Sequence, residues 1–88
     1  MKLLKLSASW CNPCKALAIT LSTCNLPLEA QEIDIDIYPE IASKYKVRSV
    51  PTMLILDNED NMISSLVGNK NKAEIENWVN TTIDSVNE

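Results

Sequence analysis

One stretch near the start of the chain joins a strand pattern to a helix pattern and contains two cysteines: Leu3-Leu4-Lys5-Leu6-Ser7-Ala8-Ser9-Trp10-Cys11-Asn12-Pro13-Cys14-Lys15. Its apolar first part, residues 3–6, predicts a short and mostly buried strand. Pro13 fits the first turn of a helix, where its missing N–H leaves no hydrogen bond unmade. The two cysteines therefore fall at the point where a strand gives way to a helix.

The helix that begins near Pro13 is predicted to run to about Thr23, because Asn25 and Pro27 stop it. Its apolar residues are Ala16, Leu17, Ala18, Ile19 and Leu21. This helix follows the first strand directly, so strand and helix form one βα unit.

The clearest strand pattern of the chain is Glu32-Ile33-Asp34-Ile35-Asp36-Ile37. Alternation with a period of two places the three isoleucines on one face of the strand and the three acids on the other. We therefore expect a strand over all of residues 32–37, with one apolar and one acidic face.

The second half of the chain predicts two helices and two strands. We expect a short helix over residues 39–45, strands over 52–56 and 62–67, and a closing helix from Lys72 to about Val86. Only residues 57–61 separate the two strands, a connection short enough to demand an antiparallel hairpin. The closing helix has an apolar stripe that should pack on the sheet, formed by Ile75, Trp78, Val79 and Ile83.

The predicted order of elements, βα-βα-ββα, defines an α/β fold. Right-handed crossovers followed by a hairpin give a four-stranded mixed sheet with strand order 2-1-3-4 and helices on both faces. With 88 residues the chain is long enough for one hydrophobic core and too short for two. Residues 1–88 are therefore expected to form a single domain.

Composition and charge argue against several classes of partner. A formal net charge of −4 without a basic cluster disfavours nucleic acid or an anionic membrane surface as the main partner. No apolar run approaches the roughly 20 residues that span a bilayer. Lys5 also interrupts the one run that resembles an export signal. We therefore expect a cytoplasmic protein, and in that reducing compartment paired cysteines are more often catalytic or metal-binding than structural.

The pair Cys11 and Cys14, spaced C-x-x-C between a strand and a helix, is typical of redox-active thiols. Backbone N–H groups at a helix N-terminus stabilise a thiolate, which is the nucleophile of disulfide exchange. We therefore expect Cys11 to be the exposed, attacking thiol. Cys14, one helical turn further on, is expected to be shielded and to resolve the mixed disulfide.

A structural zinc site and a pair of buried, unreactive cysteines are the alternatives to redox chemistry. Zinc is poorly supported, because the sequence has no histidine and only one further cysteine, Cys24. One chain therefore cannot supply the four sulfur and nitrogen ligands of a closed site. Cys24 falls at the expected end of the first helix, and we predict that it is a packing residue.

These residues resemble the thioredoxin family. Residues 6–15 resemble the family's strand and active-site loop. Its second conserved stretch, which ends at a cis-proline, is matched by residues 34–36, 39–42 and 44–52. Residues 67–68 resemble its glycine loop. The resemblance runs from Lys2 onward. It lacks the extra strand and helix that thioredoxins usually place before this point, as in some small viral and archaeal members.

The resemblance implies a thioredoxin-like fold and a role for each matching residue. Cys11 becomes the nucleophile and Cys14 the resolving thiol, with no bound cofactor and no metal. Substrate binding falls to residues around the pair: Trp10 as an aromatic flank, Val50 and Pro51 with a cis bond between them, Gly68 where a substrate backbone comes close, and the exposed Asn12 and Pro13.

Two features depart from the family. Asn12 stands where thioredoxins mostly have glycine, and the retained Pro13 keeps a reducing character expected. Lys5 stands where the family has a buried carboxylate and Glu32 where it has that acid's lysine partner, so the pair is present with its charges exchanged. If both are partly desolvated, Glu32 takes the proton of Cys14 and Lys5 favours the Cys14 thiolate. The alternative is that Lys5 extends to solvent beside an exposed Glu32.

The leading hypothesis for the function is reduction of protein disulfides by a monomeric protein, and ribonucleotide reductase is one example of a substrate. A thioredoxin reductase would then return the protein to its dithiol form. Two alternatives stay open. Glutaredoxin-like use of glutathione fits the chain length but not Gly68-Asn69-Lys70, which differs from the Gly-Gly-x-Asp-like turn of glutaredoxins. A binding subunit that works without redox chemistry would use the exposed surface around Trp10.

Overall fold

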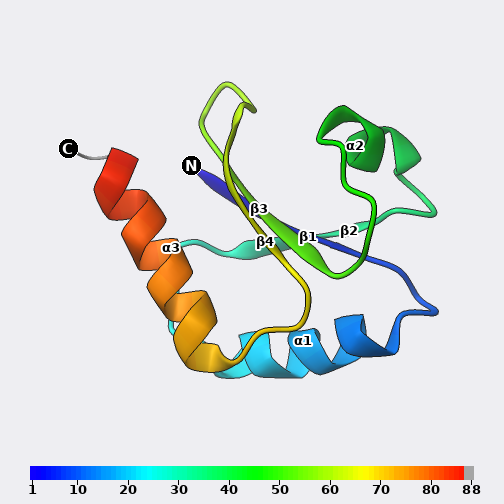
Figure 1. Ribbon diagram of the computed structural model, residues 1–88, viewed down its shortest axis with the longest axis horizontal. Coiled ribbons are helices and arrows are strands. Elements are labelled where there is room, and N and C mark those ends of the chain that lie inside the picture. The colour runs from blue at the N-terminus through cyan, green and yellow to red at the C-terminus, as the bar shows by residue number, and fades with distance from the viewer. Residues whose placement is uncertain (87–88) are drawn as a thin grey trace.

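Four strands and three helices follow one another in the computed structural model, which describes residues 1–86 (Figure 1). Their bounds are β1 Lys2–Ser7, α1 Asn12–Thr23, β2 Ala30–Asp34, α2 Pro39–Lys44, β3 Thr52–Leu56, β4 Met62–Val67 and α3 Lys72–Val86. The bounds of β3, β4 and α3 agree with the prediction. Within the described residues, no helix is both long enough and apolar enough to cross a membrane.

The strands form one mixed sheet in the order β2-β1-β3-β4, which confirms the predicted order 2-1-3-4. Strands β1 and β2 pair in parallel, whereas β1 with β3 and β3 with β4 pair antiparallel. Parallel neighbours need a long crossover, which α1 provides, and the antiparallel pair β3–β4 needs only the short loop between them. Strand β1 is therefore central, and residues 8–11 connect its end to the first turn of α1.

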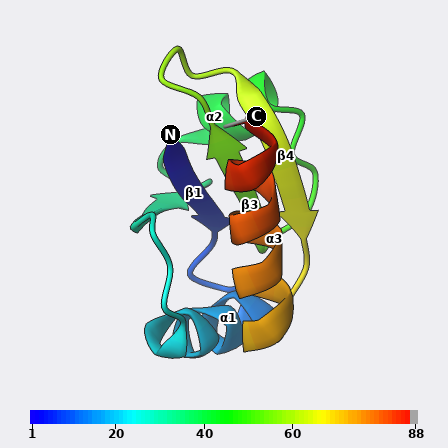
Figure 2. The same cartoon turned by 90° about the vertical axis from the view of Figure 1, so that its left-hand side faces the viewer.

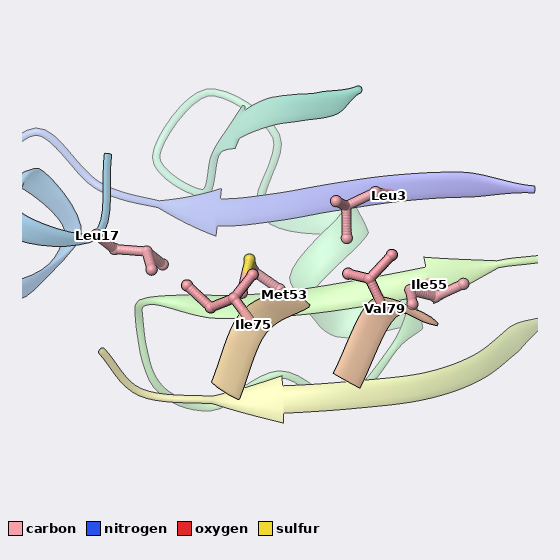
Figure 3. Packing of buried hydrophobic residues seen from close by; sticks show 6 residues of the cluster. All are labelled: Leu3, Leu17, Met53, Ile55, Ile75 and Val79. Carbon is pink, nitrogen blue, oxygen red and sulfur yellow. The ribbon is translucent and has the colours of Figure 1, made fainter. Parts of the chain in front are cut away.

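Helices α1 and α3 cover one face of the sheet and α2 covers the other, as the two views of the ribbon show (Figures 1 and 2). Between the sheet and α1 with α3 lies a core of fully buried side chains, drawn in Figure 3: Leu3, Leu17, Met53, Ile55, Ile75 and Val79. Burying each of these side chains contributes on the order of 1.5–3 kcal/mol. This core fixes α1 against β1 and so fixes the position of the cysteines.

The apolar stripe of α3 packs on the sheet as predicted. Ile75 and Val79 are fully buried, and Trp78 and Ile83 pack against the same core. The Trp78 indole N–H also donates a hydrogen bond to the Ser64 hydroxyl at 2.9 Å, which ties α3 to the edge strand β4.

The predicted extent of the second strand is wrong at its end. Strand β2 stops at Asp34, and residues 35–37 form a turn. The Asp34 side chain accepts a hydrogen bond from the Asp36 N–H at 2.9 Å, and the Asp34 carbonyl accepts others from Ile37 and Tyr38. This turn redirects the chain into α2 before the alternation ends, and it leaves Ile37 66% exposed.

Candidate active site

The end of β1 and the start of α1 place Cys11 at the helix N-cap. The chain turns tightly there, because the Cys11 N–H donates to the Ala8 carbonyl at 3.1 Å. Cys11 has extended backbone angles, and its Sγ accepts a hydrogen bond from the Cys14 N–H at 3.1 Å. N-cap side chains satisfy the unpaired N–H groups of the first helical turn in this way, and here a sulfur takes that place. The helix end therefore directs a backbone donor at Cys11 Sγ.

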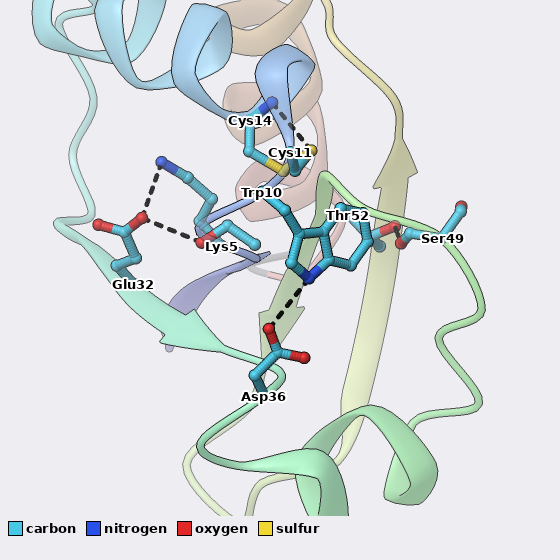
Figure 4. The surroundings of a disulfide bond; sticks show 9 residues. Lys5, Trp10, Cys11, Cys14, Glu32, Asp36, Ser49 and Thr52 are labelled. Atoms are coloured by element: carbon cyan, nitrogen blue, oxygen red, sulfur yellow. Dashed lines mark hydrogen bonds and ion pairs between the residues drawn. A yellow bond between two sulfur atoms is a disulfide. The ribbon is translucent and has the colours of Figure 1, made fainter.

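Cys11 and Cys14 form a disulfide across the first turn of α1, with their Cα atoms 5.2 Å apart (Figure 4). The two residues are almost equally buried, at 4% and 3% exposure, among Ala8 and the partly buried Ile35 and Val50. The expected difference in exposure is therefore wrong for the oxidised protein. In this form Cys11 Sγ is bonded to Cys14 and packs against the partly buried Ile35 and Val50.

The rim around the disulfide is exposed even though the sulfurs are not. Trp10 is 65% exposed, and Asn12 and Pro13 are exposed at the start of α1. The Trp10 indole N–H donates to the Asp36 carboxylate at 3.0 Å, as Figure 4 shows. The sequence placed Asp36 only on the acidic face of a strand and missed this contact. Predicting the turn after Asp34 would have been necessary to predict the hydrogen bond between Trp10 and Asp36.

The bond between Val50 and Pro51 is cis, as the resemblance implied. Pro51 is buried, and its carbonyl accepts a hydrogen bond from the Gly68 N–H at 2.9 Å. Gly68 has φ of +93°, a conformation that side chains disfavour, whereas a Cβ there would meet no atom within 4 Å. The requirement for glycine is therefore one of backbone conformation, and open space lies beside it.

Lys5 and Glu32 lie side by side in the parallel register of β1 and β2. The Lys5 Nζ is 3.4 Å from Glu32 Oε1, and the Ser7 hydroxyl donates to the same oxygen at 3.0 Å. The Lys5 side chain is only 5% exposed, whereas that of Glu32 is 66% exposed. Lys5 is therefore desolvated as expected, whereas Glu32 is mostly exposed and only slightly desolvated. The alternative, in which Lys5 extends to solvent, is wrong because Lys5 is buried.

The Glu32 carboxylate is held in its charged form. The hydrogen bond from Ser7 lowers the pKa of Glu32 below its ordinary value of 4.5, and the positive charge of Lys5 lowers it further. A carboxylate with a lowered pKa is a weaker base, so this environment opposes a role for Glu32 in taking the Cys14 proton.

Cys24 lies at the other end of α1, where it forms the C-cap and packs partly buried against the main core. The prediction that it is a packing residue is confirmed. It has a free thiol, and burial raises the pKa of this thiol, with a smaller effect from the charge of Glu76. Within residues 1–86, no three His, Cys, Asp or Glu side chains gather in a way that could hold a metal ion.

Comparison with known proteins assigns this fold and site to a family. The family model described as Thioredoxin matches residues 1–81. A thioredoxin from Rickettsia bellii is 34% identical over 80 residues, covering 86% of this chain and 75% of that protein. A thioredoxin from Bacillus subtilis is 36% identical over 77 residues, covering 83% of this chain and 73% of that protein. The solved structure of thioredoxin 1 from Thermosipho africanus superposes with a TM-score of 0.79 at 26% identity and covers all of both chains.

A mixed sheet whose central strand leads into a C-x-x-C disulfide at a helix N-terminus, beside a cis-proline, defines a class of thiol-disulfide redox domains. Within this class, the chain belongs to the thioredoxin family.

Proposed function

We propose that this chain is a protein-disulfide reductase that works by dithiol exchange, with Cys11 as nucleophile and Cys14 as resolving thiol. The observation that carries the proposal is the Cys11–Cys14 disulfide across the first turn of α1, with the Cys14 N–H directed at Cys11 Sγ at 3.1 Å. Thioredoxins of several organisms are similar to the chain over most of its length, which supports the same chemistry.

In the first step, reduced Cys11 attacks the substrate. A thiolate at the N-cap is stabilised by the first-turn N–H groups and by the positive end of the helix dipole. The Cys11 sulfur forms a bond to one sulfur of the substrate disulfide, and that disulfide breaks. The electron pair leaves with the second substrate sulfur, which takes up a proton. The product is a mixed disulfide between Cys11 and the substrate.

In the second step, Cys14 attacks the Cys11 sulfur as a thiolate. The bond between Cys11 and the substrate breaks, and the first substrate sulfur leaves and takes up a proton. The substrate has then gained a pair of electrons and becomes a dithiol, while the chain becomes the Cys11–Cys14 disulfide of this structure. We propose that a thioredoxin reductase returns the chain to its dithiol form by the reverse exchange.

The exposed rim is the proposed platform for an extended substrate segment. Trp10, Asn12 and Pro13 form this rim. Val50 packs against the two cysteines and precedes the buried Pro51, whose carbonyl is bonded to the half-buried Gly68. No hydrogen bond described within residues 1–86 engages the Val50 backbone. That backbone is therefore available to pair with a peptide, as a strand edge does. Protein disulfides are the proposed substrates, with ribonucleotide reductase as an example, and the cytoplasm is the proposed compartment.

The test is reduction of insulin disulfides, with two recycling systems run side by side. We expect reduction of insulin when NADPH and a thioredoxin reductase recycle the protein, and little when glutathione and its reductase do so. Recycling by glutathione alone would replace this proposal with the glutaredoxin-like one. Full activity in Cys11→Ser would contradict the proposed chemistry. No reduction of insulin by the wild type in either recycling system would also contradict it, and that is the result expected of a binding subunit.

A further inference from the structure

Among residues 1–86, Lys5 is the charged residue that the fold buries, with 4% exposure. It lies in the central strand β1, which runs straight into the loop that leads to Cys11. Burying a charge is costly unless something in the site compensates it. A functional role in the neighbouring redox pair would explain why the fold buries this cation.

Lys5 faces the side of the sheet that α1 covers. Residues two apart in a strand share a face, and Leu3 of β1 packs in the same core as Leu17 of α1. Cys14 precedes Leu17 by three positions, so both lie on the buried side of the helix. Figure 4 shows the Lys5 side chain beneath α1, between Glu32 and Cys14.

The positive charge of Lys5 is only partly compensated. Lys5 forms an ion pair with Glu32 at 3.4 Å, and the Glu32 side chain is 66% exposed. Water screens an exposed carboxylate far more than it screens a buried ammonium. Two other neighbours among the described residues are uncharged: β3 presents Met53 opposite Lys5, and α3 presents Ile75 to the core on this face of the sheet. The positive charge of Lys5 is therefore incompletely balanced beneath the helix that contains Cys14.

We propose that Lys5 sets the redox potential of the Cys11–Cys14 pair, making it more oxidising than an uncharged residue at this position would. Reduction adds a pair of electrons to a neutral disulfide and breaks its S–S bond. Where only one of the two sulfurs is protonated, the product is an anion. A nearby cation stabilises that anion and not the neutral disulfide, so it favours the reduced form. This inference rests on the proposed function, and it adds a positioning residue that acts through space on the pair.

Opposite signs are expected for the two members of the ion pair. Lys5→Met removes the cation and should shift the pair toward its disulfide form. Glu32→Gln removes the anion, leaves Lys5 in place and should shift the pair toward its dithiol form. The second shift should be smaller, because Glu32 is exposed to solvent. A general loss of stability in both variants is not expected to shift the dithiol–disulfide equilibrium in opposite directions.

The experiment equilibrates the protein in graded glutathione buffers and measures the fraction of disulfide by alkylation and mass. A Cys24→Ser background leaves a single pair to titrate. We expect Lys5→Met to change the equilibrium constant at least about tenfold toward the disulfide, which corresponds to about 30 mV. The pH at which one thiol of the pair ionises should also rise in this variant. Lys2→Met is the matched control, because it removes an exposed lysine of the same strand, and it should leave the equilibrium unchanged.

Three results would overturn the inference: a Lys5→Met shift no larger than that of Lys2→Met, a shift in the opposite direction, or shifts of the same sign in Lys5→Met and Glu32→Gln. If a denaturant melt shows that Lys5→Met is unfolded, the Glu32→Gln variant tests the inference by itself. An unchanged or lowered redox potential in Glu32→Gln then contradicts the proposal. Insulin reduction by the wild type tests the proposed function separately. A potential that depends on Lys5 in a protein that cannot reduce insulin would overturn that function only.

Discussion

Strand β1 and helix α1 each have one end at the disulfide and one end away from it, and similar residues stand at both ends. Near the disulfide, Lys5 is buried beside Glu32, and two cysteines are joined. At the far ends, Lys2 pairs with Asp60 at 2.5 Å with both side chains exposed, and Cys24 has a free thiol. The comparison shows that residue type alone does not decide chemistry, because burial and position on the helix change what each group can do.

The two ends of α1 act on sulfur in opposite ways. At the N-cap, a backbone N–H points at Cys11 Sγ, which favours a thiolate. At the C-cap, the Cys24 Sγ lies 3.4 Å from the Thr20 carbonyl oxygen, and the negative end of the helix dipole disfavours a thiolate. Burial of Cys24 adds to this effect by raising its pKa. Reactivity should therefore be confined to the N-terminal end of the helix.

The largest expected effect separates the two ends of α1 by activity. Cys11→Ser should lower insulin reduction to the rate of uncatalysed exchange, because no nucleophile remains at the N-cap. Cys24→Ser should keep activity within about twofold of the wild type, because Cys24 lies at the opposite end of α1 from the reacting cysteines. The steady-state rate with reductase-linked recycling measures both. Equal losses in the two variants would remove the distinction between the ends.

A second prediction separates the two cysteines of the pair. Cys14→Ser should accumulate a mixed disulfide with substrate proteins, because nothing is left to displace the partner from Cys11. Cys11→Ser should trap far less. Non-reducing gels and mass spectrometry of each variant after exposure to a disulfide substrate provide the measurement, and equal trapping by both would contradict an ordered two-step exchange.

A third prediction compares the two ion pairs of β1 by stability. Glu32→Gln should lower the free energy of unfolding by about 1–3 kcal/mol, because it leaves the buried Lys5 ammonium without its anion. Asp60→Asn should give no change beyond measurement error, because its pair with Lys2 is exposed. Urea melts at neutral pH measure both. A larger loss in Asp60→Asn would reverse the comparison.

The effect of Glu32 should also depend on pH. Its pKa is lowered in the folded chain, so its contribution is present above the ordinary value of 4.5 and is lost as the pH falls through the folded-state value. The stability difference between wild type and Glu32→Gln should therefore shrink in acid.

The smallest expected effect concerns the reactivity of Cys24. In a Cys11→Ser, Cys14→Ser background, Cys24 should react with iodoacetamide slowly at neutral pH and faster only as the pH rises past its ordinary value of 9.0, because its pKa is raised by burial. A short unstructured peptide with one cysteine is the control. Labelling of Cys24 at the rate of this peptide at pH 7 would show that the far end of α1 does not suppress the thiolate.

Much of the fold followed from local patterns, and its errors have local causes. Turn residues and a short connection marked both sides of β3 and β4, so their bounds and pairing were predictable. The alternation through Ile37 concealed the end of β2, because the turn there depends on a hydrogen bond from the Asp36 N–H to the Asp34 side chain. The alternation of apolar and polar residues gives no information about such a hydrogen bond.

The candidate site was predictable in its residues and less so in their environments. Spacing placed the cysteines, and the family resemblance placed the cis-proline, which the structure contains. Glu32 lies on the edge strand β2, and the sequence pattern does not show how far the helices extend over that edge. The burial of Cys11 among Ala8, Ile35 and Val50 depends on residues from three separate segments, which the local C-x-x-C pattern does not contain.

The ordered exchange can be tested in a single turnover of the wild type. Reduced protein is mixed with an equal amount of a peptide disulfide, quenched with acid at successive times, and mapped by mass spectrometry to locate the bound peptide. We expect the peptide to appear transiently on Cys11 and then to be released as the Cys11–Cys14 disulfide forms. A peptide found first on Cys14 or on Cys24, or release without formation of that disulfide, would contradict the mechanism.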